Sequence, residues 1–291
     1  MDKHAYLIMA HNNFYILEKL LLMLDDSRND IFIHIDKKVK GFDFNYFNAL
    51  CLKSNIVFTK KRINVKWGTQ SQIKNEMNLF ETAYKYNPSG YKYYHLISGV
   101  DLPIKSQDYI HSYFKDKSAT YLHFTGTPSI YDRQRISRYR VRISNGKLGN
   151  WFYILQSKFN IDRLKRSKYE IKKGYNWASL TNDAVKTLLD NKKDIYKLTF
   201  CSFCADEVYK QIILDYNNVN IYKNFDGKTD DLRLVDWERG DANHPHIFNK
   251  DDFDLLINSD KLFARKFDTQ TDKEIIDEIF EYVMQKDGRN I

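Results

Sequence analysis

Short apolar runs alternate with longer amphipathic segments in the first third of the chain, and this alternation is the strongest constraint on its fold. The apolar runs have the length of buried strands and lie at residues 6–10, 31–36, 56–59 and 91–97. Between them, apolar residues recur every three or four positions, which indicates a helix beginning at about Asn12 or Asn13 and another over 70–84. This β-α-β order predicts an α/β fold in which a mostly parallel, doubly wound sheet carries helices on both faces.

Polar residues follow three of the predicted strands directly. His11 comes after the first strand, Asp36 ends the second, and Asp101 closes the run Ser98-Gly99-Val100-Asp101 after the fourth. Sheets of this kind bind ligands in the crevice beyond the carboxyl ends of their strands. We therefore expect His11, Asp36 and Asp101 to line a binding crevice.

The remainder of the chain has a less regular pattern. Residues 126–174 are rich in Arg, Lys, Tyr and Ser, which predicts a basic surface loop or a partly mobile lid. A strand is expected at 177–181, with helices at about 182–191 and 204–214. Thr271-Asp272-Lys273-Glu274 has the pattern of a capping box and predicts a final helix. Four prolines and eleven glycines leave no long flexible linker, so we expect one domain over residues 1–291.

The composition favours an anionic partner. The formal net charge is +8, and 15% of the residues are aromatic. Positive charge attracts nucleotide diphosphates, nucleic acids or anionic lipid surfaces, while aromatic rings suit both the core and the apolar faces of sugars. The chain has no RNA-recognition signature, zinc-finger spacing or Gly-rich phosphate loop, so we expect no nucleic-acid partner.

Location is predicted from the apolar runs and the cysteines. No apolar stretch approaches the roughly 20 residues of a membrane-spanning helix, and no secretion signal is recognised. An odd count of three cysteines fits a reducing compartment. We therefore expect a cytoplasmic protein. The basic run 133–140 would also suit peripheral contact with the inner face of a membrane. A solvated loop is the stronger explanation of that run.

Metal ligation is not needed to explain the sequence. The sole Asp-x-Asp pattern, Asp252-Phe253-Asp254, lies near the C-terminus and is typical of a helix cap. Cys201 and Cys204 have redox-type or zinc-type spacing, but zinc needs two further ligands. We therefore expect no metal ion and no cofactor. A metal-dependent site at Asp36 or at 252–254 is the alternative.

Two cationic runs and one acid are candidates for chemistry on a phosphorylated substrate. Arg265 and Lys266 lie in an apolar frame, and Arg233 and Arg239 lie in the run 232–240. Arg can bind phosphate oxygens through two parallel hydrogen bonds, and Lys acts as a compact charge. On the residues alone, however, a solvated surface or a structural ion pair is the favoured explanation of each cluster. Glu207 opens a predicted helix, where an acid usually complements the helix dipole; action as a general base is the less favoured interpretation on the residues alone.

Five segments, in this order, resemble the core-2/I-branching N-acetylglucosaminyltransferase family, which is glycosyltransferase family 14. They are Ala5-Tyr6-Leu7-Ile8-Met9-Ala10-His11, Ile33-His34-Ile35-Asp36-Lys37, Ser98-Gly99-Val100-Asp101-Leu102-Pro103-Ile104-Lys105, Ala205-Asp206-Glu207 and Leu262-Phe263-Ala264-Arg265-Lys266-Phe267-Asp268. The likeness runs from about residue 4 to about residue 285. The third and fifth segments are the sharpest.

The resemblance implies a GT-A-like fold and an inverting, metal-independent transfer from a UDP-sugar to a glycan hydroxyl. UDP-GlcNAc is the family's commonest donor, and UDP-xylose, UDP-galactose and UDP-glucuronate are alternatives. It implies that Glu207 is the base, that Lys266 faces the donor diphosphate, and that His11 and Asp36 hold the uridine. Residues 1–125 would form the nucleotide-sugar-binding half, and 126–291 the acceptor and diphosphate half.

The sequence departs from the family pattern in two respects. Relatives carry a phosphate-binding Arg about two dozen residues before this Lys, where the present chain has Asn243-His244-Pro245-His246. Arg239, Arg233 or Arg265 is expected to substitute, with Arg239 the preferred candidate. Asp101 and Trp177 are expected near the sugar or acceptor. The disulfide cysteines and membrane anchor of Golgi relatives are also missing, which suits a bacterial member that extends a lipid-linked glycan during surface-polysaccharide assembly. A silent glycan-binding module and a nucleic-acid-binding protein are the rival hypotheses.

Overall fold

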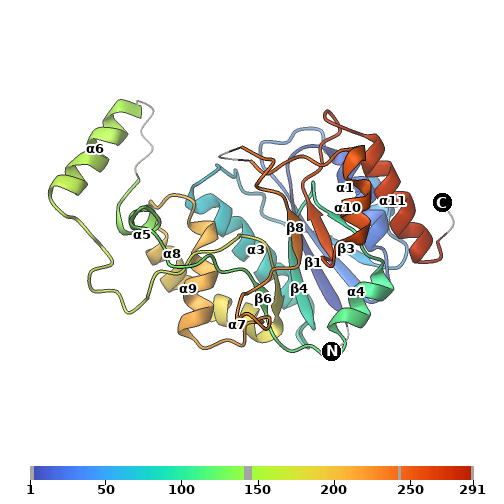
Figure 1. Ribbon diagram of the computed structural model, residues 1–291, viewed down its shortest axis with the longest axis horizontal. Helices are drawn as coiled ribbons and strands as arrows, with labels where there is room; N and C mark the ends of the chain where they lie inside the picture. The colour runs from blue at the N-terminus through green and yellow to red at the C-terminus, as the bar shows by residue number, and fades with distance from the viewer. Residues whose placement is uncertain (1–2, 141–145, 242–243, 290–291) are drawn as a thin grey trace.

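A six-stranded sheet in the order β3-β2-β1-β4-β7-β6 forms the centre of the protein (Figure 1). The computed structural model describes residues 3–140, 146–241 and 244–289. Four neighbouring strands are parallel: β1 (His4–Ala10), β2 (Asn29–Ile35), β3 (Asn55–Phe58) and β4 (Tyr93–Ser98). Strand β7 (Ala178–Thr181) is antiparallel to β4, and β6 (Tyr121–Leu122) is antiparallel to β7. The predicted strands and the mostly parallel sheet are confirmed.

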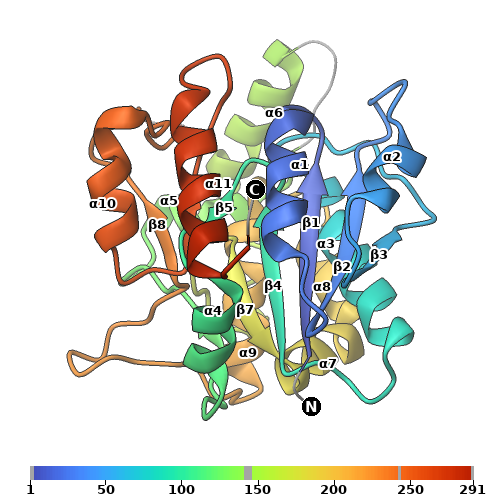
Figure 2. The same cartoon turned by 90° about the vertical axis from the view of Figure 1, so that its right-hand side faces the viewer.

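Helices cover both faces of this sheet, as predicted (Figure 2). Helices α1 (Phe14–Leu24) and α11 (Glu274–Lys286) lie on one face; α3 (Gln70–Tyr86), α7 (Asn182–Asp190) and α9 (Tyr209–Tyr216) lie on the other. Successive strand side chains point to opposite faces. In β1, Tyr6 and Ile8 therefore join the core under α1, whereas Ala5 and Leu7 join the core under α3.

A second, three-stranded sheet in the order β5-β9-β8 was not predicted from the sequence. Strands β5 (Leu102–Pro103), β9 (Phe263–Arg265) and β8 (Arg233–Val235) contain only two or three residues each. Strand β9 pairs antiparallel with β5 and parallel with β8. This small sheet brings the end of the Ser98–Asp101 segment next to the Arg265-Lys266 pair. Shorter helices complete the layers: α2 (Phe44–Ala49), α4 (Gln107–Phe114), α8 (Lys192–Leu198) and α10 (Phe253–Asn258).

Three local predictions need correction. The segment expected to be a loop contains helix α5 (Ile130–Ser137), which a Ser129/Asp132 capping box begins, and helix α6 (Gly146–Lys158). The helix expected at 204–214 breaks at Val208 into a short 3-10 turn, η1 (Ala205–Glu207), and α9. At the last helix, Asp272 rather than Thr271 accepts the amide hydrogens of Glu274 and Ile275. None of the helices in the described ranges is both long and apolar enough to cross a membrane.

Candidate active site

His11 and Asp36 lie together at the carboxyl ends of neighbouring strands β1 and β2. The amide of Asp36 donates to the carbonyl of Ala10 (3.0 Å). The buried Asp36 carboxylate accepts the amides of Lys38 (2.8 Å) and Val65 (3.2 Å), so it shapes the loop that borders the crevice. Desolvation lowers the pKa of His11, although the Asp36 carboxylate opposes this effect. A neutral imidazole beside a fixed carboxylate suits hydrogen bonding to an uncharged heterocycle.

Asp101, Arg265 and Trp177 form a second cluster beside the first. The Asp101 carboxylate is buried, accepts the amide of Ser98 (2.7 Å) and accepts Nη1 of Arg265 (2.7 Å). Burial raises the pKa of Asp101, and Arg265 opposes that shift. The Arg265 guanidinium lies 4.5 Å from the centre of the Trp177 ring, within cation–π range. Arg265 is therefore a cation held in place by a buried acid and an aromatic face.

Lys266 follows directly after β9, and its ammonium differs from the other candidate cations. Its carbonyl accepts the amide of Phe248 (3.1 Å), which fixes the backbone. Among the described residues, no carboxylate or other acceptor is bonded to its Nζ. Partial burial lowers the pKa of Lys266, and the charge of Arg265 acts in the same direction. A partly desolvated ammonium next to a second cation is suited to bind an anion.

The other two cations named from the sequence are engaged in internal contacts. Arg233 is buried, and its guanidinium donates to Ser179 Oγ and to the carbonyls of Ala178 (both 2.8 Å) and Leu96 (3.2 Å). These bonds tie β8 to the central sheet. Arg239 is more exposed and forms ion pairs with Asp236 and Asp252. The structure thus does not bring Arg233 into the crevice with Lys266.

Arg239 belongs to an ion-pair cluster that includes the Asp-x-Asp pattern. Its guanidinium contacts Asp236 (2.6 Å) and Asp252 (2.7 Å), and Asp252 also accepts His246 Nε2 (3.0 Å). Asp252 forms a capping box with Asn249 at the turn η2 (Lys250–Asp252). The cap of this turn is therefore Asn249, and Asp252 is its partner at the third position rather than the cap residue that the sequence predicted.

Glu207 ends turn η1, with its carboxylate held from one side. Oε2 accepts Nη2 of Arg135 at 2.7 Å, and the Glu207 side chain is 37% exposed. Arg135 is buried, and its guanidinium also donates to the carbonyl of Cys204 (2.7 Å). Arg135 is not singled out by the sequence, because the basic run 133–140 has the composition of a surface loop. The Ser129/Asp132 capping-box pattern is the signal that would have placed it on a helix.

A buried polar layer lies behind Glu207. Asp206 accepts Nε2 of Gln72 (2.9 Å), and its other oxygen is buried without a partner among the described atoms. Burial raises the pKa of Asp206 to about 7, with the charges of Glu76 and Glu207 adding to the shift. Glu76 and Lys210, both fully buried, form an ion pair at 2.6 Å. This layer fixes η1 against α3.

Residues 174–177 connect Glu207 to the Arg265 cluster. The amide of Gly174 donates to the carbonyl of Glu207 (2.9 Å), and three residues later Trp177 lies against Arg265. Between them Tyr175 stacks on Trp237, with ring centres 6.2 Å apart. The backbone of residues 174–177 therefore joins Glu207 to the Trp177–Arg265 pair, and Lys266 follows Arg265 in the chain.

Residues 4–279 match the family described as Core-2/I-Branching enzyme. The chain belongs to the core-2/I-branching family of glycosyltransferases. It is also similar to a Bos taurus protein named "Beta-1,3-galactosyl-O-glycosyl-glycoprotein beta-1,6-N-acetylglucosaminyltransferase", with 23% identity over 315 residues that cover 97% of this chain and 70% of that protein. Among solved structures, apo mouse xyloside xylosyltransferase 1 aligns with a TM-score of 0.39 and 9% identity, over 89% of this chain and 96% of that one.

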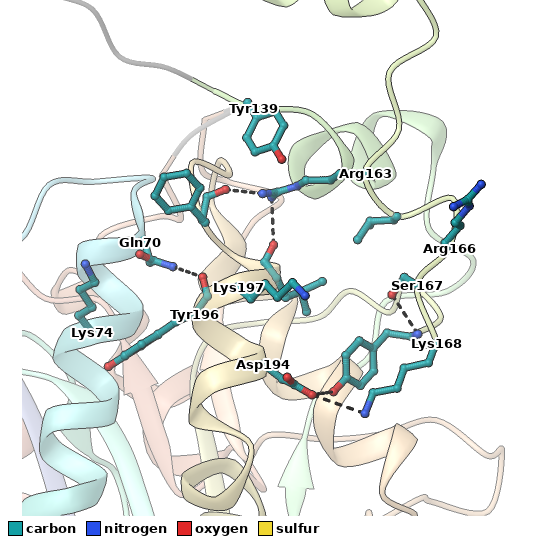
Figure 3. A pocket seen from close by; sticks show the side chains of 14 residues that line it. Gln70, Lys74, Tyr139, Arg163, Arg166, Ser167, Lys168, Asp194, Tyr196 and Lys197 are labelled. Carbon is teal, nitrogen blue, oxygen red and sulfur yellow. Dashed lines mark hydrogen bonds and ion pairs between the residues drawn. The ribbon is translucent and has the colours of Figure 1, made fainter.

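The glycosyltransferase also has a cavity of about 760 Å³ next to helix α5 (Figure 3). Its wall includes five basic side chains and one acid: Lys74, Arg163, Arg166, Lys168, Lys197 and Asp194. The Tyr169 hydroxyl donates a hydrogen bond to the Asp194 carboxylate (2.7 Å). Tyr139 and Tyr196 add further aromatic surface to the wall. Arg163 connects the cavity to α5, because its amide donates to the carbonyl of Ser137 (3.1 Å). No residue assigned to the site from the sequence lines this cavity.

The two cysteines with redox-type or zinc-type spacing lie just before Glu207. Cys201 and Cys204 are free thiols, and burial raises the pKa of Cys204 to about 12. In the described ranges, no three His, Cys, Asp or Glu side chains are grouped so that they could share a metal ion.

Proposed function

We propose that this glycosyltransferase moves a sugar from a UDP-sugar to a hydroxyl of a glycan by one inverting displacement, with protein cations rather than a metal ion at the diphosphate. The observation that carries the proposal is the connection of Glu207, through a bond from the Gly174 amide to its backbone carbonyl and then residues 174–177, to Arg265, which precedes Lys266; the Glu207 carboxylate itself is 37% exposed and held by Arg135. A base and a cationic group are the two functions that such a reaction needs.

In this proposal Glu207 accepts the proton of the acceptor hydroxyl. As that oxygen bonds to the anomeric carbon, the bond from this carbon to the diphosphate oxygen breaks, and UDP leaves with the electron pair. One displacement inverts the anomeric centre, so an α-linked donor gives a β-glycoside. Arg135 holds Oε2, which leaves Oε1 of the half-exposed side chain to face the acceptor.

The diphosphate is assigned to Lys266, with Arg265 as its neighbour. The Lys266 ammonium has a lowered pKa and no paired carboxylate among the described residues, so a phosphate oxygen would supply its counter-charge. Asp101 and Trp177 hold Arg265 in position. His11 and Asp36, at the ends of β1 and β2, are assigned to the uridine.

The donor and acceptor are proposed from chemistry and from the bovine relative. That relative is named a β-1,6-N-acetylglucosaminyltransferase, which favours UDP-GlcNAc here. For the acceptor, the cavity beside α5 offers tyrosine rings and an excess of cations, which favours a glycan that carries acidic groups. We assign such a glycan, linked to a lipid carrier in bacterial surface-polysaccharide assembly, as the acceptor.

The test is UDP release from a panel of UDP-sugars, with and without EDTA, in wild type and Glu207→Gln. The proposal expects release from one donor that survives EDTA and falls about 10²- to 10⁴-fold in the variant. The surface substitution Glu170→Gln is the matched control and should leave release unchanged. Strict dependence on an added divalent ion, or near-normal release by a folded Glu207→Gln protein, would overturn the mechanism.

A further inference from the structure

Positive charge is concentrated in one part of the chain. Residues 126–174 contain 13 Lys and Arg but three Asp and Glu, whereas the remainder contains 33 basic and 35 acidic residues. The segment thus carries a net charge of +10 and the rest −2. A charge imbalance of this size directs one face of a protein toward anions.

Helix α6 lies within this basic segment and projects from the body of the protein (Figure 1). Three of its polar residues face the protein: Tyr153 donates to Gln134 Oε1 (2.8 Å), Gln156 bonds the backbone of Tyr139, and Ser157 bonds Arg138. Positions 153, 156 and 157 share one face of a helix. The face that normally packs apolar side chains onto a core is therefore polar in α6.

The opposite face of α6 is apolar and exposed. Trp151 and Ile154 are 60% and 61% exposed, and directly after the helix ends at Lys158, Phe159 is 69% and Ile161 42% exposed. Of the 17 large hydrophobic side chains exposed in the described chain, five lie in residues 151–161. An apolar patch of this kind on a soluble surface marks a contact with another phase or another molecule.

We propose that residues 151–165 dock on an anionic lipid bilayer. Trp151, Ile154 and Phe159 enter the boundary between headgroups and acyl chains, while Lys158 and Lys165 remain at the lipid phosphates. Lys158 lies one helical turn after Ile154 on the same face, so its flexible stem can follow the apolar surface while its ammonium reaches the phosphates. Apolar and aromatic side chains with such lysines bind a helix in the plane of a membrane interface.

Charge and shape favour a membrane over the other occupants. A second copy of the chain would bring two of these basic segments together, each with a net charge of +10 over residues 126–174, and they repel. A nucleic acid would neutralise the charge but would leave Ile154 and Phe159 exposed to water. An anionic bilayer satisfies both features, with each nearby cation adding to the attraction. This docking is independent of the proposed transfer reaction, so its test needs no turnover.

The test is flotation of the full chain with vesicles of phosphatidylcholine, with and without phosphatidylglycerol. Wild type should bind the anionic vesicles and lose most of that binding in high salt. The triple variant Trp151→Ser, Ile154→Ser, Phe159→Ser and the double variant Lys158→Glu, Lys165→Glu should each bind at least roughly tenfold more weakly. The matched control Leu52→Ser, Phe225→Ser, Leu255→Ser removes exposed apolar residues elsewhere and should bind as wild type does.

Several outcomes would overturn the proposal. They are failure of wild type to bind anionic vesicles, equal binding to both vesicle types, and unchanged binding by a folded triple variant. Dimerisation that depends on Trp151, without vesicle binding, would assign the surface to a second copy. A gel shift with RNA, without vesicle binding, would assign it to nucleic acid. Thermal melts of each variant check folding, which these exposed positions should preserve.

Discussion

Arg135 Nη2 and Glu207 Oε2 lie 2.7 Å apart, and the two side chains differ sharply in exposure: 7% for the Arg and 37% for the Glu. The arginine is fixed from behind by the carbonyl of Cys204, so it holds the carboxylate from the protein side. The free side of Glu207 then faces outward. Arg135 is thus a positioning residue for the proposed base.

Arg135→Lys should lower kcat for transfer at least tenfold with little change in the KM for the donor. Lysine keeps the charge but cannot bond both Glu207 and the Cys204 carbonyl in the planar geometry of a guanidinium. Steady-state kinetics measures both constants. Arg133→Lys, in the same helix but paired with Asp162 at the surface, is the control. Unchanged kcat in a folded Arg135→Lys protein would remove Arg135 from the mechanism.

Lys266→Met should weaken donor binding and slow turnover. A hydrogen bond to a charged group contributes about 1.5–3 kcal/mol, which corresponds to roughly 10- to 150-fold in the Kd for UDP. Isothermal titration with UDP, which requires no acceptor, measures this effect. Lys250→Met removes an exposed lysine nearby and should bind UDP as wild type does. Equal affinities for wild type and Lys266→Met would move the diphosphate site elsewhere.

The sequence predicted the strands that place His11 and Asp36 at one edge of the sheet. These residues directly follow β1 and β2, whose mostly apolar runs at 6–10 and 31–35 mark them as buried strands. The pairing of Asp101 with Arg265 spans 164 residues and depends on strands of two or three residues, which carry no periodic signal. Arg135 was missed because α5 has a mixed surface rather than a clear apolar stripe. The amphipathic pattern of α6 gives no sign that its apolar face points outward.

Asp206→Asn should change how stability depends on pH. The pKa of Asp206 is about 7 in the folded protein, against 3.8 for an ordinary Asp, because the folded state favours the protonated form. Between these values the folded state binds more protons than the unfolded state, so stability falls as pH rises. Asparagine cannot ionise and should remove that loss.

The measurement for Asp206→Asn is the urea midpoint at pH 5 and at pH 8. The urea midpoint of Asp206→Asn, measured relative to that of wild type, should be higher at pH 8 than at pH 5. Asp226→Asn, at an exposed turn, should have the same pH dependence as wild type. If the difference in urea midpoint between Asp206→Asn and wild type is the same at pH 5 and pH 8, the pKa of Asp206 is not raised by folding.

Gly174→Ala should separate Glu207 from the rest of the site. A Cβ at this position would lie 1.7 Å from the carbonyl oxygen of His123 and 2.6 Å from Gln211 Nε2, so backbone must move. Overpacking in a core typically costs about 1–3 kcal/mol, and a clash with backbone should reach at least the upper end. The same movement would lengthen the bond from the Gly174 amide to the Glu207 carbonyl and displace η1.

The temperature of thermal unfolding and the rate of UDP release should therefore both fall in Gly174→Ala. Gly126→Ala, where a Cβ meets open space, should alter neither quantity. Full stability in Gly174→Ala would mean that residues 174–177 adapt freely, and the link between base and cations would then lose its structural basis.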